Sequence, residues 1–452
     1  MKDRLNMKTK IMSRGPVSLD HTKRSDLKDY FENAWEIYEE LFSAIRSEST
    51  FYLAPDSLRH PLIFYYGHTA VFYVNKLILS GMISHGINPR FEGLFAKGVD
   101  PELPEHLAAE FKWPSVQEVR EYRTEVYNLV WNVIDKMEIP EQTFSTDPIW
   151  NLHMAIEHDR IHFETSSVLI RQLNANQLER PSGWSYAPTF GFSEEFELVH
   201  VKGGRVTLGK TEPSGLYGWD NEYGQLTLDV KPFYATKNLV TNGEFINFVK
   251  KGGYQKDKYW SKEGLEWKTR TSANLPKFWI KKAENYAYRA MFDEIEMPLD
   301  WPAEVNAYEA LAYCNFKGPE FRLLSEAEFK LLTKNVHPKV EPALSEQFNL
   351  QMKFGSPSPV GYFESQNGDA FNDLYGNVWD WLSDSFYALP GFKEHAHYSD
   401  FSLPYFGDDH RMLLGGSWAT SGTGASQFYR LWFRDYFYQH AGFRLAKTVL
   451  NE

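Results

Sequence analysis

Cysteine is almost absent from this chain, which has 452 residues and a single cysteine, Cys314. One thiol cannot form an intramolecular disulfide, and it cannot supply a cysteine-based structural zinc site. The sequence also lacks a run of about 18 uncharged apolar residues, the length that a membrane-spanning helix needs, and its N-terminus lacks the apolar segment of a signal peptide. These absences predict a soluble, cytoplasmic protein.

Basic residues are fewer than acidic ones, with 48 Lys and Arg against 60 Asp and Glu, and the formal net charge is -12 at pH 7. A protein that binds nucleic acid normally carries a concentrated basic face, which releases counterions from the phosphates. An anionic membrane surface attracts the same kind of face. The charge balance therefore predicts partners that are neither nucleic acid nor membrane.

Aromatic residues, by contrast, are abundant, with 14 Trp, 26 Tyr and 33 Phe. Together with a hydrophobic fraction of 42%, they predict a globular protein with large, aromatic-lined interior surfaces. The chain is too long for one ordinary core, so two domains are expected.

The pattern of apolar residues changes once along the chain, and this change predicts an α+β protein of two domains. Residues 25–175 repeat at helical spacing and predict a four-helix bundle, preceded by an N-terminal arm over 1–24. Residues 176–196 are polar, rich in Pro and Gly and without periodicity, which is typical of a linker. Short, turn-separated segments then predict an irregular mixed domain over 197–452.

One helix of the predicted bundle, "EHDRIHFETSSVLIRQL", carries two histidines four residues apart. At about 100° per residue, one face of this helix holds Met154, His158, Ile161, His162, Thr165 and Leu169. Two imidazoles one turn apart can converge on one metal ion inside a bundle. His68 lies in another strongly apolar helix, where an unpartnered imidazole is costly to bury, and is the third candidate ligand.

The other side of the histidine helix is expected to face water. Arg160 and Glu164 can pair there at i,i+4, together with Arg171. Asp159 lies about 100° from the histidine face and is expected either to support the ligands from behind or to be solvated. The segment "HDRIH" is close to the zinc-protease pattern H-E-x-x-H, but the shorter Asp replaces the general-base Glu, so hydrolysis is the weaker interpretation. Structural histidines bonded to carbonyl groups are the other alternative.

Several longer motifs allow a family comparison. They are "YYGHTAVFYVNKL", "NPRFEGLFAKGVD", "EHDRIHFETSSVLIRQL", "YGWDNEYG", "GNVWDW" and "FYQHAGFRL". In this order, over nearly the whole chain, they resemble the iron-dependent sulfoxide synthases of ovothiol biosynthesis, which are relatives of the ergothioneine enzymes. The resemblance implies an N-terminal DinB-like four-helix bundle and a C-terminal domain of the formylglycine-generating-enzyme fold, which is C-type-lectin-like.

The second domain contains further segments that are similar to landmarks of that fold, namely "RLLSEAEFK", "GNVWDW", "GGSWA" and "AGFRL". We expect their tryptophans and glycines to build core and turns, namely Trp379, Trp381, Gly415, Gly416 and Trp418. The copper-binding cysteine pair of true formylglycine-generating enzymes cannot form from one cysteine, which excludes sulfatase activation.

The resemblance assigns three iron ligands to His68, His158 and His162. It implies a mononuclear non-haem Fe(II) site with positions left for water, a thiolate and dioxygen, since redox-inert zinc cannot activate dioxygen. The implied reaction joins the sulfur of L-cysteine to C5 of the imidazole of L-histidine and gives 5-histidylcysteine sulfoxide.

The resemblance also implies a tyrosine near the iron, supplied by the second domain. The segment "HAHYSDFSLPYFGDDH" resembles the corresponding loop, and Tyr398 is the residue that matches. Tyr405 and Tyr387 lie nearby and are the alternatives. The expected role is to supply a proton or to control an oxidised intermediate.

Substrate binding is expected from "YRLWFRDYFYQHAGFR", which contains Arg430, Trp432 and Arg434. An arginine fork can hold a substrate carboxylate through two hydrogen bonds. The chain departs from the family pattern here, with Leu431 in place of an Asn and Gly424 where an acidic residue is usual. These two departures bear on the contacts with the imidazole.

Three alternatives to ovothiol chemistry remain open. The first is an ergothioneine-type enzyme that uses trimethylhistidine with cysteine or gamma-glutamylcysteine. The second is a zinc-dependent thiol transferase or hydrolase on the same bundle, and the third is a non-catalytic binding module. Many ovothiol synthases continue into a methyltransferase domain, whereas this sequence stops at Glu452, so a separate methyltransferase and a C–S lyase are expected later in the pathway unless the sequence is truncated.

Overall fold

The computed structural model describes residues 13–101, 111–192, 196–211, 215–336, 344–363 and 370–449. The chain divides into two compact units. The helical unit contains Met1–Trp184, Glu212–Tyr217 and Met291–Asp293, and the mixed unit contains Ser185–Thr211, Gly218–Ala290 and Glu294–Glu452.

The division after Trp184 falls inside the segment predicted as a linker. From Ser185 on, however, this segment packs within the mixed unit. The backbone N–H of Ala187 donates to Ser356 Oγ at 2.9 Å, and the hydroxyl of Thr189 donates to Asp300 Oδ1 at 2.6 Å. Because these hydrogen bonds fix the chain, the described part of this segment is docked rather than free.

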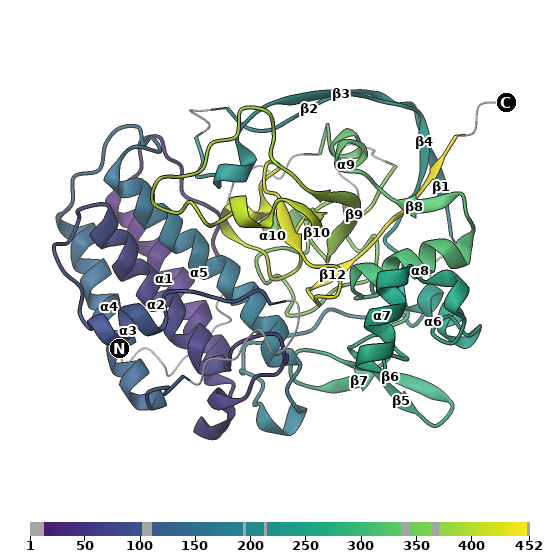
Figure 1. Ribbon diagram of the computed structural model, residues 1–452, viewed down its shortest axis with the longest axis horizontal. Helices are drawn as coiled ribbons and strands as arrows, with labels where there is room; N and C mark the ends of the chain where they lie inside the picture. The colour runs from purple at the N-terminus through teal and green to yellow at the C-terminus, as the bar shows by residue number, and fades with distance from the viewer. Residues whose placement is uncertain are drawn as a thin grey trace. The chain divides into compact units, whose positions relative to one another are not determined.

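In the described part of the helical unit, four long helices form a bundle: α1 (Arg24–Ser43), α2 (Leu62–Leu79), α4 (Val116–Lys136) and α5 (Pro148–Arg171) (Figure 1). Helix α2 packs against α4 and α5, and α1 packs against the same two helices. The shorter elements are η1 (Glu48–Tyr52), α3 (Pro89–Leu94) and η3 (Ala175–Gln177). The helical bundle predicted for residues 25–175 is therefore present, while its likeness to DinB proteins stays a prediction.

Local sequence signals explain where these helices begin. Helix α4 starts with a capping box, in which Ser115 Oγ accepts from the N–H of Glu118 and Glu118 Oε2 accepts from the N–H of Ser115. Helix α5 starts with Pro148, which needs no hydrogen-bond partner in the first turn.

The expectation of a solvated strip on α5 is wrong. Arg160, Glu164 and Arg171 are all buried. The Arg160 guanidinium donates to Ser13 Oγ at 2.9 Å and to the carbonyl of Tyr30 at 3.0 Å, and it lies 4.0 Å above the Tyr30 ring. Helix α1 and the segment before it therefore cover the face that the helical wheel leaves open.

The mixed unit contains small sheets and short helices. One sheet has the order β1-β4-β13-β8, with β1 (Leu198–Val201), β4 (Phe233–Thr236), β13 (Leu445–Thr448) and β8 (Phe321–Leu323). Another has the order β11-β10-β9-β12, with β11 (Leu431–Phe433), β10 (Gly407–Leu414), β9 (Trp379–Phe386) and β12 (Ala441–Gly442). Strands β4 and β13 pair antiparallel, which joins the beginning and the end of this unit.

The remaining elements of the mixed unit surround these sheets. The strands are β2 (Gly204–Leu208) and β3 (Leu226–Val230), which pair together, and β5 (Trp279–Lys282), β6 (Asn285–Arg289) and β7 (Glu294–Glu296). The α-helices are α6 (Asn242–Lys250), α7 (Lys262–Thr271), α8 (Ala307–Lys317), α9 (Glu326–Leu332) and α10 (Leu344–Gln347). The 3-10 turns are η4 (Asp220–Glu222), η5 (Asp257–Tyr259), η7 (Leu403–Tyr405) and η8 (Gly422–Ala425).

Aromatic residues form the interior of the mixed unit, as predicted. Trp379, Trp381 and Trp418 are fully buried, and the Trp381 indole donates to the carbonyl of Val305 at 2.9 Å. Gly415 has a φ of 97° and Gly416 a φ of 83°, a conformation that favours glycine. The structural role expected for these five residues is confirmed.

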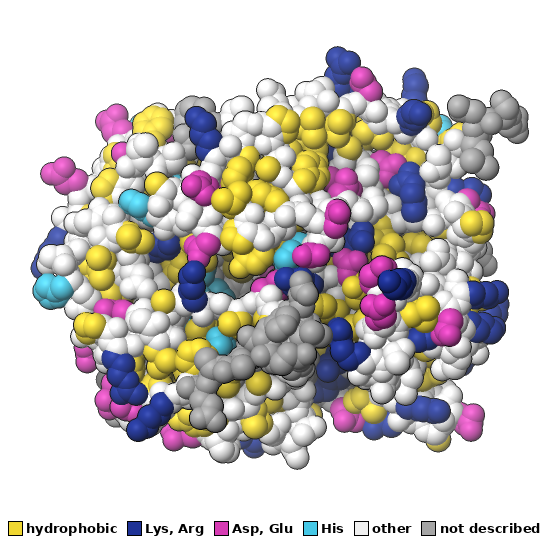
Figure 2. Space-filling model, in the orientation of Figure 1, with side chains coloured by type: hydrophobic (Ala, Val, Ile, Leu, Met, Phe, Trp, Pro, Cys, Tyr) yellow, Lys and Arg dark blue, Asp and Glu magenta, His cyan; other side chains and the backbone are white. Residues whose placement is uncertain are grey.

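The described surface carries both kinds of charge. On the face shown in Figure 2, Lys and Arg side chains are interspersed with Asp and Glu side chains. Among the described residues, no helix has the length and apolar character needed to cross a membrane.

Candidate metal centre

Three histidine side chains meet inside the helical unit. His68 comes from the middle of α2, and His158 and His162 come from successive turns of α5. Their potential ligand atoms all lie within 4.8 Å of one another. The ring centroids are 5.0 Å apart for His68 and His158, 4.7 Å for His68 and His162, and 4.3 Å for His158 and His162. The structure thus brings together the three predicted ligands.

The orientation of His68 depends on a close approach of the chain after α3. The Nδ1 atom of His68 lies 2.6 Å from the carbonyl oxygen of Phe95. A carbonyl only accepts, so Nδ1 carries the proton and Nε2 keeps its lone pair for a metal. Gly67 permits this approach, because a Cβ atom there would lie 2.7 Å from the Phe95 ring.

A second contact fixes His158. The Phe72 ring, one turn after His68 on α2, stacks on His158 with centroids 3.5 Å apart and an interplanar angle of 5°. The buried ammonium of Lys76 lies 4.7 Å from the centroid of the same Phe72 ring. Helix α2 therefore contributes one candidate ligand and also orients a candidate ligand of α5.

Burial keeps the three imidazoles neutral. It lowers the pKa of His68 to about 4, and it holds the pKa of His158 and the pKa of His162 well below the ordinary range. The neighbouring imidazoles add to this effect, and Lys76 does so at His158. Neutral imidazoles have the free lone pairs that a metal needs.

The donor set fits a divalent transition metal. The Nδ1 atom of His162 is buried and has no hydrogen-bond partner among the described residues. Within those residues, no Cys, Asp or Glu joins the three histidines in a metal-sized group. Three nitrogen donors suit iron, zinc or copper and leave coordination positions for other ligands.

Asp159 is fully buried, so the alternative that it is solvated is wrong. Burial raises the pKa of its carboxyl to about 7, against the opposing effect of Arg123 and Arg160. The Tyr73 hydroxyl donates to Asp159 Oδ2 at 3.3 Å. Asp159 thus has a hydrogen-bond partner on α2, and it is not part of the ligand group.

The predicted catalytic tyrosine belongs to the mixed unit. The Tyr398 ring is partly buried and lies 5.3 Å from the Phe401 ring and 6.4 Å from the Trp219 ring, centroid to centroid. Burial raises the pKa of the Tyr398 phenol, and the nearby carboxylates of Asp400 and Asp220 raise it further. The phenol therefore keeps its proton at neutral pH.

The two alternative tyrosines have structural contacts in the same unit. The Tyr387 hydroxyl donates to Glu326 Oε2 at 2.5 Å. The Tyr405 ring lies 5.7 Å from the Trp432 ring and 5.2 Å from the His410 ring. The Tyr387 hydroxyl is thus engaged by a buried carboxylate, and Tyr398, which the sequence motif matches, stays the prediction.

Arg430, predicted to bind substrate, is engaged within the protein. Its Nε and Nη2 atoms donate to the two carboxylate oxygens of Glu326 at 2.8 and 3.1 Å. Its Nη1 atom donates to the carbonyls of Asn221 and Tyr387. Since the side chain is buried and its donors are occupied, we assign Arg430 a structural role and leave it out of the proposed substrate site.

Trp432 and Arg434 lie on and just after β11. Trp432 stacks on Phe386 with centroids 4.3 Å apart, and Arg434 is partly buried. Next to them, Arg411 holds Asp435 through two hydrogen bonds of 2.8 and 3.0 Å. Trp432 and Arg434 stay predictions for substrate binding.

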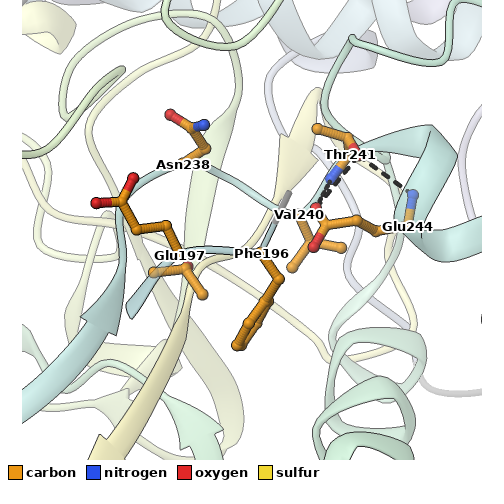
Figure 3. Close-up of a pocket in the computed structure, with 7 residues that line it drawn as sticks. Phe196, Glu197, Asn238, Val240, Thr241 and Glu244 are labelled. Atoms are coloured by element: carbon orange, nitrogen blue, oxygen red, sulfur yellow. Dashed lines mark hydrogen bonds between the residues drawn. The ribbon is translucent and has the colours of Figure 1, made fainter. Parts of the chain in front are cut away.

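A small pocket of the mixed unit lies near the start of α6 (Figure 3). The carboxylate of Glu244 accepts there from the backbone N–H and the hydroxyl of Thr241, and Asn238 Oδ1 accepts from Asn372. These polar groups serve a helix cap and a loop contact, so the histidine cluster is the better candidate site.

Comparison with known proteins defines the class of the mixed unit. Residues 188–449 match the family model "Sulfatase-modifying factor enzyme 1-like domain" (FGE-sulfatase), and the chain belongs to this family. This match confirms the predicted fold of the second domain.

Curated relatives narrow the comparison further. The chain is 32% identical to hercynine oxygenase of Mycobacterium tuberculosis, over 53% of this chain and 57% of that protein. It is 23% identical to ergothioneine biosynthesis protein 1 of Schizosaccharomyces pombe, over 89% and 53%. It is 27% identical to hercynine oxygenase of Mycolicibacterium thermoresistibile, over 74% and 76%. The chain thus spans only about half the length of the first two relatives. Two of these names refer to hercynine and one to ergothioneine biosynthesis, and none refers to ovothiol, so the ovothiol assignment gains no support from them.

Proposed function

We propose that the protein is an Fe(II)- and O2-dependent sulfoxide synthase, which forms a C–S bond between a thiol and the imidazole of a histidine derivative. The observation that carries this proposal is the cluster of buried His68 and His158 with partly buried His162, whose potential ligand atoms lie within 4.8 Å of one another. Relatives named hercynine oxygenase support the reaction class.

The names of the relatives favour trimethylhistidine as the imidazole substrate, with cysteine or gamma-glutamylcysteine as the thiol. The ovothiol-type pair of histidine and cysteine is the second candidate. It is favoured by the motifs "EHDRIHFETSSVLIRQL" and "FYQHAGFRL", which resemble the ovothiol group.

Iron bound at this centre would supply the activation of dioxygen, which a redox-inert metal cannot. The three neutral imidazoles leave the charge of a divalent ion uncompensated, so they favour the binding of an anionic thiolate. Phe72 and Phe95 hold His158 and His68 in fixed orientations. Tyr398, whose raised pKa keeps its hydroxyl protonated, is the proton donor that we propose.

The overall reaction is balanced. One thiol, one imidazole C–H and one O2 give the sulfoxide and one water. Oxygen accepts four electrons, two from formation of the C–S bond and two from oxidation of the sulfur.

The test is a mass-spectrometric assay of protein loaded with Fe(II) without air, then given thiol, imidazole and O2. Trimethylhistidine and histidine are each combined with cysteine and with gamma-glutamylcysteine. We expect a product with the summed mass of both substrates, less two hydrogens and plus one oxygen, greatest with trimethylhistidine. Zinc-loaded protein and His162→Ala serve as controls without product.

Other outcomes change the assignment. A product that forms best from histidine and cysteine moves the ovothiol pair to the front. Cysteine sulfinic acid alone means that the thiol and oxygen sites stand but the imidazole substrate is another. No oxygen-dependent product, with zinc bound tightly, contradicts the proposal and favours a zinc-dependent transferase or hydrolase.

A further inference from the structure

A chain of buried polar groups crosses the helical unit beside the histidine cluster. It starts at Arg123 of α4, whose guanidinium is almost inaccessible to solvent and lies 4.3 Å from the Trp35 ring centroid. Arg123 Nε donates to Glu39 Oε1 at 2.5 Å. Its Nη1 atom donates to the carbonyl of Tyr66 at 2.7 Å and to Thr69 Oγ1 at 2.9 Å.

The chain continues from α2 to α5. The Thr69 hydroxyl, which accepts from Arg123, also lies close to the carboxylate of Asp159. The Tyr73 hydroxyl, one turn further along α2, donates to Asp159 Oδ2 at 3.3 Å. Asp159 itself has no solvent exposure. Arg123 therefore joins α4 to α1 and α2, and the Asp159 carboxylate joins α5 to α2.

Both ends of the α2–α5 connection lie next to candidate ligands in the sequence. Thr69 directly follows His68, and Asp159 directly follows His158. Neighbouring residues of a helix share one rigid backbone segment, with a rise of about 1.5 Å per residue. A shift between Thr69 and Asp159 would therefore move His68 relative to His158 by a similar distance.

We propose that Asp159 is a positioning residue, which together with Thr69, Tyr73 and Arg123 fixes the spacing of His68 and His158. We call these four residues the ligand-spacing network. The inference rests on the proposed function, because it takes the three histidines to be metal ligands.

The energetics favour positioning over stabilisation. A buried ion pair contributes little net stability compared with apolar residues of the same size, because desolvation offsets the attraction. Apolar contacts between helices, in turn, are non-directional. A directional contact such as the Tyr73–Asp159 hydrogen bond is what can specify one register of α2 on α5, which is the best-attested role of buried polar groups.

The experiment uses Co(II) as the probe and measures its dissociation constant by competition with a chelator, together with the visible absorption spectrum of the Co(II)-loaded full chain. The variants are Tyr73→Phe and Thr69→Val, each of which removes a hydroxyl and keeps the side-chain shape. We expect each to weaken Co(II) binding by about tenfold, the lower end of the effect of groups that support metal ligands. The absorption bands should shift, because the coordination geometry changes.

Two control variants separate positioning from general destabilisation. Thr69→Ser keeps the hydroxyl and should bind Co(II) like the wild type. Tyr127→Phe removes another phenol-to-carboxylate bond of the bundle, from Tyr127 to Glu32 Oε1 at 3.1 Å, and should also leave binding unchanged. Thermal unfolding of all variants records their stability.

The outcomes are distinguishable. If Tyr73→Phe and Thr69→Val keep the wild-type dissociation constant and spectrum, the positioning role is overturned, even if both variants melt at lower temperature. If the wild type binds no Co(II), or if His162→Ala binds it as tightly, the metal centre itself fails and the network's role fails with it.

Discussion

Two groups of polar side chains, one in each unit, differ in how the protein satisfies them. In the mixed unit, the Arg430 guanidinium meets the Glu326 carboxylate at 2.8 Å, and both side chains are almost fully buried. In the helical unit, the histidine cluster contains no carboxylate, and His162 Nδ1 has no hydrogen-bond partner among the described residues. The satisfied pair of Arg430 and Glu326 is structural, whereas three converging imidazoles with an unsatisfied nitrogen point to a ligand from outside.

The largest effect on metal binding is expected at the cluster of His68, His158 and His162. His162→Ala should weaken metal binding by more than about 100-fold, since loss of a group that only supports a ligand already costs 10–100-fold. The fold should remain, because removing a neutral imidazole leaves no unpaired charge behind. Metal content by elemental analysis and helix content by circular dichroism check this prediction, and a variant that retains its metal contradicts it.

At the buried pair of Arg430 and Glu326, we expect a loss of stability without a loss of metal binding. Glu326→Ala leaves the Arg430 guanidinium buried without its carboxylate, which should lower the free energy of unfolding by about 3–5 kcal/mol. Metal binding by the helical unit should not change. Urea unfolding measures the loss.

The exposed pair of Arg205 and Asp229 provides the matched control for this prediction. Because both side chains are well exposed, Asp229→Ala should change stability little or not at all. A loss at Glu326 no larger than at Asp229 would show that the buried pair is not structural.

These two regions also differ in how far the sequence predicts them. His158 and His162 lie on one helical face, which is local information, and the apolar helix around His68 is local too. The sequence therefore predicts the bundle and the candidate ligands. The partner of Arg430 lies 104 residues away in the chain, and no periodicity indicates it.

The prediction of a solvated strip on α5 is wrong for the same reason, because contacts between distant residues cannot be seen in the local sequence. A helical wheel shows that Arg160 and His158 point in different directions, but not that Ser13 and α1 cover the Arg160 side. The linker prediction is not such an error, but the polar composition of residues 176–196 cannot show that Thr189 is held by Asp300. The Ser115 and Pro148 helix starts, in contrast, depend on nearby residues and could have been read from the sequence.

A smaller effect is expected where the backbone supports a ligand. Gly67→Ala places a Cβ atom 2.7 Å from the Phe95 ring, so Phe95 must move and its carbonyl must shift from His68. We expect a loss of about 1–3 kcal/mol in stability from overpacking. Metal affinity should fall by about tenfold, as for other groups that support a ligand. Calorimetry and Co(II) titration measure the two effects.

Gly93 is the matched control, because it also lies in a helix but a Cβ atom there would have no neighbour within 4 Å. Gly93→Ala should leave metal binding unchanged and slightly stabilise the protein, by less than about 1 kcal/mol. Equal effects of the two substitutions would contradict the role of Gly67.

The smallest effect concerns a buried carboxyl of the mixed unit without the bidentate arginine that Glu326 has. Glu309 accepts from the Tyr254 hydroxyl at 2.5 Å and from the backbone N–H of Asn306 at 2.9 Å. Burial raises the pKa of its carboxyl from 4.5 to about 7. The folded state therefore holds a proton that the unfolded chain has already lost, and stability falls as the pH rises between these two values.

Between pH 6 and pH 7 this carboxyl should reduce the free energy of unfolding by about 1 kcal/mol. Glu309→Gln keeps the size and an acceptor oxygen but cannot ionise, so its stability should change less over the same interval. Because every other titrating group is shared, the difference between the two urea-unfolding series isolates Glu309. If the wild type and Glu309→Gln lose stability in parallel, the pKa of Glu309 is not raised. The hydrogen bonds from Tyr254 and Asn306 would then compensate for burial as fully as the arginine does at Glu326. A buried carboxylate would in that case be satisfied without a charged partner.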